Sequence, residues 1–140
     1  MDPEKIFSRL QKHMEYTDEE MALFKSDPYK VKMVTETPEF VKCRVVAEVI
    51  ESQGCHTKHK VGDKFVMTPG GGLLTDQCPK EICIHAVAAV ERIIPVISER
   101  LVAKSDPNFE RFNIVQCSDI GLDKGGWGKI LMKVYVEKAD

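Results

Sequence analysis

Cysteine and histidine gather in three short segments of this chain. The segments are 54–63, 78–85 and 116–119. Each lies next to a predicted strand or helix, so a compact domain could bring all three to one end of a sheet. Thiols and imidazoles bind soft metal ions, and they also act as nucleophiles and proton carriers. The sequence therefore suggests two kinds of chemistry, metal binding and thiol catalysis.

A metal site is the first hypothesis. Three thiolates and an imidazole suit tetrahedral zinc or an iron–sulfur cluster. The chain offers such a set in Cys55, His59, Cys78 and Cys117. Nearby carboxylates, Asp63 and Asp119, would hold the imidazole in one tautomer or bond the ligands. The sequence thus indicates a metal-binding protein, and an accessory role beside a redox enzyme would suit it.

A small enzyme with a Cys/His/Asp site in a loop-lined pocket is the alternative. A proline follows Cys78 and is favoured at the first helical position, so Cys78 is predicted to be a helix N-cap. Its thiol would face free main-chain N–H groups that stabilise a thiolate. His59 or His56 would then act as general base or acid, oriented by Asp63 or Asp119.

The remaining residues of these types are predicted to be structural. Cys43 and Cys83 fall on the apolar faces of a predicted strand and helix, where cysteine behaves as a small hydrophobe. His85 lies within the same apolar helix and is predicted to be a hydrogen-bonded core residue. Trp127 stands among three glycines, where its ring could cover a bound cofactor or anchor the loop. The anchor is the preferred interpretation.

Hydrophobic periodicity predicts an α+β fold, with an antiparallel sheet packed on one long central helix. Apolar alternation and turn signals place strands at about 40–49, 64–68, 111–117 and 129–137. The central helix is predicted from Pro79 to about Ala103, kinked or broken near Pro95. Helices before strands, and one core helix between strands, are typical of this fold class.

An N-terminal helical arm, residues 1–38, is predicted to precede the core domain, residues 39–140. It contains a pair of helices with a break near Thr17, which forms a capping box with Glu20. Residues 1–39 carry nine acidic and six basic side chains. The arm could dock a protein partner or a second copy of the chain, or simply pack on the core.

Composition limits the function classes. The chain has 140 residues, of which 43% are apolar and 30% charged, with a net charge of −2. The lack of a basic excess argues against nucleic-acid binding. The start of the sequence shows no signal peptide, and no apolar stretch is long enough to span a membrane. We therefore expect a cytoplasmic protein whose five cysteines are reduced.

The spaced motifs also resemble a known family. They are Gly54-Cys55, His59-Lys60-x-Gly62-Asp63, Cys78-Pro79 and Cys117-x-Asp119. In this order they resemble a family of small, uncharacterised cytosolic proteins from anaerobic bacteria and archaea, over about residues 43–137. The resemblance implies one shared constellation of these cysteines, His59 and the two aspartates, but no particular reaction. The family pattern has Cys-Pro-Asp where this chain has Cys117-Ser118-Asp119.

Overall fold

The computed structural model describes residues 2–109 and 111–139. The chain divides into two compact units between Phe40 and Val41, two residues after the predicted boundary. Within the described residues, none of the helices combines the length and apolar character needed to cross a membrane.

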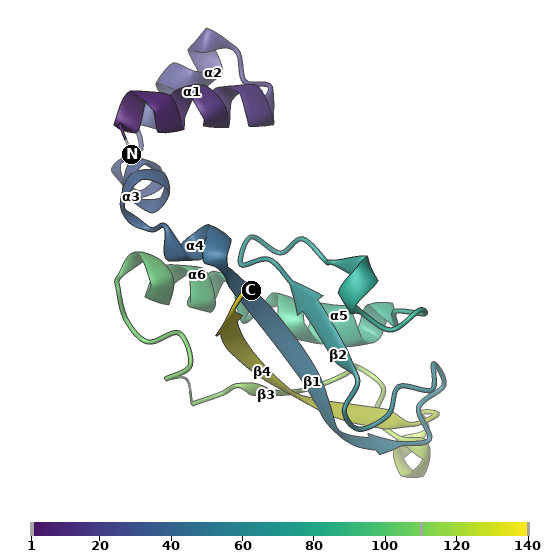
Figure 1. The fold of residues 1–140 in the computed structure, drawn as a ribbon. Coiled ribbons are helices and arrows are strands. Elements are labelled where there is room, and N and C mark those ends of the chain that lie inside the picture. The colour runs from purple at the N-terminus through teal and green to yellow at the C-terminus, as the bar shows by residue number, and fades with distance from the viewer. Residues whose placement is uncertain (1, 110, 140) are drawn as a thin grey trace. The chain divides into compact units, whose positions relative to one another are not determined.

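The N-terminal unit consists of helices. They are α1 (Pro3–Met14), α2 (Asp18–Lys25) and α3 (Pro28–Glu36), and α4 (Glu39–Lys42) leads into the second unit (Figure 1). The capping box at the start of α2 is confirmed, since Thr17 and Glu20 exchange both hydrogen bonds. The predicted pair is incomplete, because a third helix, α3, begins at Pro28 soon after α2 ends at Lys25. Asp27 caps α3 by accepting main-chain N–H bonds.

The second unit is built on a four-stranded antiparallel sheet. Its strands are β1 (Cys43–Gln53), β2 (Lys64–Met67), β3 (Ile114–Gln116) and β4 (Lys129–Lys138), in the spatial order β2-β1-β4-β3. The α+β class and the antiparallel sheet are confirmed. The first strand begins three residues later than predicted, because residues 39–42 are helical. Of the predicted 111–117 strand, only Ile114–Gln116 pairs with β4.

The core lies on one face of this sheet. On β1, Val45, Ala47 and Val49 share this face and are fully buried, and Val46, between them, is fully buried as well. Their cross-strand partners on β4 are buried beside them. Two helices, α5 (Ile84–Glu91) and α6 (Ile94–Val102), cover this face (Figure 1). Cys43 is buried, as predicted.

The single long central helix is not confirmed. Residues 92 and 93 separate α5 from α6, and Pro95 lies in the first turn of α6, so the predicted break is present. The predicted helix start at Pro79 is wrong. Cys78 follows a 3-10 turn, η1 (Thr75–Gln77), and its sulfur accepts the Val66 N–H at 3.3 Å. This contact holds Cys78 beside the edge strand β2, and α5 begins five residues after Pro79.

Candidate functional site

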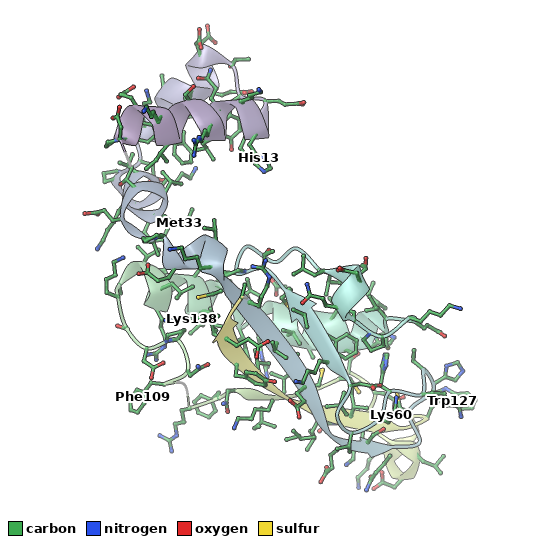
Figure 2. All side chains as sticks on the ribbon, in the orientation of Figure 1. His13, Met33, Lys60, Phe109, Trp127 and Lys138 are labelled. Atoms are coloured by element: carbon green, nitrogen blue, oxygen red, sulfur yellow. The ribbon has the colours of Figure 1, made fainter. Side chains whose placement is uncertain are left out.

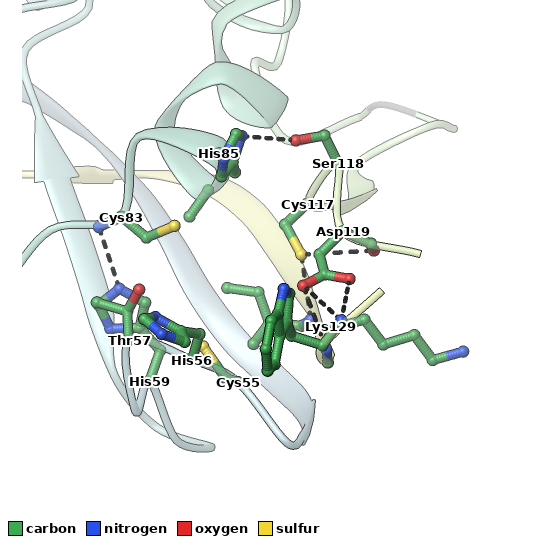
Figure 3. Close-up of a pocket in the computed structure, with 14 residues that line it drawn as sticks. Cys55, His56, Thr57, His59, Cys83, His85, Cys117, Ser118, Asp119 and Lys129 are labelled. Carbon is green, nitrogen blue, oxygen red and sulfur yellow. Dashed lines mark hydrogen bonds between the residues drawn. The ribbon is translucent and has the colours of Figure 1, made fainter. Parts of the chain in front are cut away.

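A pocket of about 350 Å³ opens at one end of the sheet. Its walls come from the loop after β1, the start of α5 and the segment 117–130 that leads into β4 (Figure 3). This end of the molecule carries the labelled side chains of Lys60 and Trp127 (Figure 2). Three cysteines line the pocket, Cys55, Cys83 and Cys117. Pockets of this volume hold small organic molecules.

Cys83 is the N-cap residue of α5, and its sulfur points toward the middle of the pocket (Figure 3). The prediction that Cys83 belongs to the core is wrong, since its side chain is half-buried and lines the pocket. Burial acts to raise the pKa of this thiol. The Ala86 N–H, the Thr57 hydroxyl and the His85 N–H outweigh burial, so the pKa of Cys83 is lowered from its ordinary value.

His59 is a buried residue that holds the main chain at Cys83. Its side chain is 2% exposed, its Nε2 accepts the Cys83 N–H at 3.2 Å, and its ring meets Phe65 edge to face. Burial lowers the pKa of His59, although the carboxylates of Asp63 and Glu81 oppose this. A neutral ring that accepts at Nε2 carries its proton at Nδ1, which lies 3.9 Å from Asp63. His59 therefore fixes the main chain at Cys83.

Asp63 is occupied mainly by its own loop. Its carboxylate accepts the main-chain N–H of Lys60 at 3.0 Å and also pairs with the Lys60 ammonium. Burial would raise the pKa of Asp63, but these two Lys60 contacts lower it overall. At 3.9 Å from His59 Nδ1, the Asp63 carboxylate is too far for a hydrogen bond and acts on that ring only through its charge. Its bonds to Lys60 support the loop.

His85 lies in the first turn of α5 and lines the pocket. The predicted core position is wrong, because the side chain is exposed. Its Nδ1 lies 2.9 Å from the Ser118 hydroxyl, across the pocket rim (Figure 3). An exposed imidazole that lines a pocket can serve as a proton carrier.

The other predicted sulfur ligands are in different surroundings. Cys117 is buried, and its sulfur accepts the Ile130 N–H at 3.4 Å while facing the Asp119 carbonyl. Cys55 is half-buried in the pocket wall. Cys78 lies outside the lining and is bonded to Val66. The structure thus brings Cys55, His59 and Cys117 to one pocket, with Cys83 there in place of Cys78.

Asp119 organises the loop that carries Trp127. Its carboxylate accepts the N–H groups of Gly121, Trp127 and Gly128 at 3.0 to 3.3 Å. The Gly121 N–H is the main cause that lowers the pKa of Asp119, and those of Gly128 and Trp127 add to it. This carboxylate is committed to the main chain. It acts as a loop-forming group rather than as an acid or base.

The Trp127 ring is 75% exposed, so the preferred interpretation that it anchors the loop is wrong. It lines the pocket and meets the His56 ring edge to face, with ring centroids 6.1 Å apart. The loop is held instead through main-chain bonds to Asp119. The ring is therefore available to a ligand.

Within residues 2–109 and 111–139, no three or more histidine, cysteine, aspartate or glutamate side chains form a group that could hold a metal ion. The predicted ligand set is divided, because Cys78 is engaged by β2 and the Nε2 of His59 is engaged by Cys83. Metal binding by these residues stays a prediction.

Comparison of the chain with protein-family models, curated proteins and solved structures found no match. Sequence reasoning missed Cys83 because it fits an apolar helical stripe, and missed His85 because it lies within the same predicted apolar helix. The spacing of that stripe is the same whether the helix begins at Pro79 or at Ile84. The one available signal was local, since each lies within seven residues of Cys78.

Proposed function

We propose that this pocket is the active site of a small thiol-dependent enzyme that transfers an acyl group to water. Cys83 is the nucleophile and His85 is the proton carrier. The observation that supports this most strongly is the placement of the Cys83 thiol, which faces a pocket from the N-terminus of α5. The groups around it lower its pKa and so favour the reactive thiolate.

The reaction has two balanced steps. The Cys83 thiolate attacks the carbonyl carbon of an ester or thioester, an S–C bond forms, and the leaving group departs with its bonding pair. Water then attacks the thioester carbon while neutral His85 takes one of its protons. The S–C pair returns to sulfur, and the acid product leaves with the hydroxyl group. His85 returns its proton to the solvent or to the departed group.

The surrounding groups position these two residues. His59 holds the Cys83 main chain at 3.2 Å, and the Thr57 hydroxyl favours the thiolate. The Ser118 hydroxyl lies 2.9 Å from His85 Nδ1, and in the tautomer in which Nδ1 donates to this hydroxyl the Nε2 atom is left to take the proton. The His85 and Ala86 N–H groups in the first turn of α5 face the Cys83 sulfur and favour its thiolate form.

The test uses 4-nitrophenyl acetate, an activated ester whose leaving group absorbs visible light. We expect a burst of 4-nitrophenolate and an acetyl group on the peptide that contains Cys83, found by mass spectrometry after acid quench. Cys83→Ser should remove both. Cys78→Ser is the matched control, because Cys78 lies outside the pocket, and it should keep both. A burst that persists in Cys83→Ser, or acetylation confined to another cysteine, would refute the proposal.

Metal binding, the first function expected from the sequence, has less support. Cys55 and Cys117 share the pocket, but Cys78 is held 3.3 Å from the Val66 nitrogen. Elemental analysis of anaerobically purified protein tests it separately. A stoichiometric zinc or iron content that is lost in Cys55→Ser would favour the metal site over the enzyme.

A further inference from the structure

We propose that Trp127 and His56 form an aromatic clamp at the mouth of the pocket, which binds a planar aromatic group of the ligand. This inference deepens the proposed function by naming the substrate class, and for the catalytic step it rests on that function. Binding to the clamp is itself independent of the thiol.

The two rings stand at the edge of the pocket that Cys83 faces. Their centroids are 6.1 Å apart and their planes meet at 65°, so one ring presents its edge to the other. Three quarters of the Trp127 side chain is exposed. A tryptophan side chain buries roughly 150–250 Å² of surface when it is fully covered. Aromatic rings prefer to pack against one another offset or edge to face. A planar ligand would cover this apolar surface and gain such contacts.

The loop under Trp127 holds the ring in place. The carboxylate of Asp119 accepts three main-chain N–H bonds from it, including that of Trp127 itself. A Cβ on Gly128 would collide with the main chain at Gly54, and one on Gly126 would collide with the Asp119 carboxylate. The clamp therefore rests on two loops packed main chain against main chain. An exposed ring on a loop built this closely is preorganised for a partner.

The pocket behind the clamp is small and partly apolar. Its wall includes the buried side chains of Ala86 and Ile130, together with the sulfurs. A volume of about 350 Å³ admits a single ring with a short substituent rather than a polymer or a folded protein. The ligand is therefore a small aromatic ester, thioester or amide, whose ring rests on Trp127 and whose carbonyl reaches toward Cys83.

Trp127 is the only tryptophan in the chain, so its fluorescence reports on the clamp alone. The probe is 4-nitrobenzamide, an aromatic quencher that cannot acylate the protein, titrated into the Cys83→Ser variant. We expect saturable quenching, whereas acetamide should leave the emission unchanged. His56→Ala should weaken the affinity several-fold, up to about tenfold from the usual energy of an aromatic pair. His13→Ala, in the N-terminal unit, is the matched control and should bind as before.

Quenching that rises linearly, as it does with free N-acetyltryptophanamide, would overturn the clamp. Equal affinities of the His56→Ala and His13→Ala variants for 4-nitrobenzamide would also overturn it. Because the variant lacks the Cys83 thiol, these outcomes are independent of catalysis. A failed acyl burst with saturable quenching would reject the proposed reaction and keep the clamp. An acyl burst on Cys83 without saturable quenching would keep the proposed reaction and reject the clamp.

Discussion

His59 determines where the Cys83 main chain lies, and it can do so only while its ring is neutral. The Nε2 atom accepts the Cys83 N–H at 3.2 Å, and a protonated imidazole has no acceptor there. The side chain is 2% exposed, so protonation would also place a charge among apolar neighbours such as Phe65. The position of the proposed nucleophile is therefore linked to the protonation of a second residue.

This linkage predicts a pH-dependent stability. Burial lowers the pKa of His59 in the folded chain, whereas the unfolded ring titrates near 6.5. The stabilisation is complete above pH 6.5 and is lost as the pH falls from there through the folded pKa. One such proton gives a slope of at most about 1.4 kcal/mol per pH unit.

Urea unfolding at pH 7.5 and at pH 5.5 measures this slope. The wild type should lose stability when the pH falls from 7.5 to 5.5, and His59→Leu should lose less over the same interval. At pH 7.5 the variant should already be less stable than the wild type by about 1–3 kcal/mol, because its Cys83 N–H has lost its acceptor. His13→Leu is the control for an exposed histidine. Equal losses in wild type and His59→Leu would contradict the assignment of a neutral buried His59.

At the scale of elements, the pocket depends on two loops that approach each other without side chains between them. The loop after β1 and the loop before β4 meet at Gly54 and Gly128. A methyl group on Gly128 would overlap the Gly54 main chain, so one of the loops would have to move. The clamp residues, His56 and Trp127, stand on these same two loops.

Gly128→Ala should therefore destabilise the protein by about 1–3 kcal/mol and separate the loops. Thermal unfolding measures the first effect, and the Trp127 emission maximum and its quenching by acrylamide measure the second. Gly70→Ala is the matched control, because Gly70 lies in an open turn whose nearest side-chain atom would be 3.9 Å from the new methyl group. Equal effects of the two substitutions would show that the loops do not meet as described.

The elements themselves were predictable wherever periodicity determined them. Alternation of buried residues identified β1, and the capping box identified the start of α2. The start of α5 was not predictable, because Cys78, the predicted N-cap, is engaged instead by a sulfur–main-chain contact with Val66. Such a contact joins residues twelve positions apart and leaves no trace in local sequence patterns.

At the scale of the whole molecule, the second unit contains the complete candidate site. The sequence placed Cys55, His59 and Cys117 in one constellation, and all three line the pocket. The sequence also placed Cys78 at the site and Cys83 in the core, because the helix start was predicted five residues too early. The predicted docking of a partner or second copy by the N-terminal helices stays a prediction.

The central claim is that Cys83, of the five cysteines in the chain, is the activated thiol. The most direct measurement is the rate of iodoacetamide alkylation at each cysteine of the intact protein between pH 5 and 9, read by peptide mass spectrometry. Cys83 should react fastest at neutral pH, with a midpoint below the value of about 8.5 for a free thiol. The buried Cys43 and Cys117 should react slowly throughout. A Cys83 midpoint at or above the free value, or faster reaction at Cys78, would contradict the account.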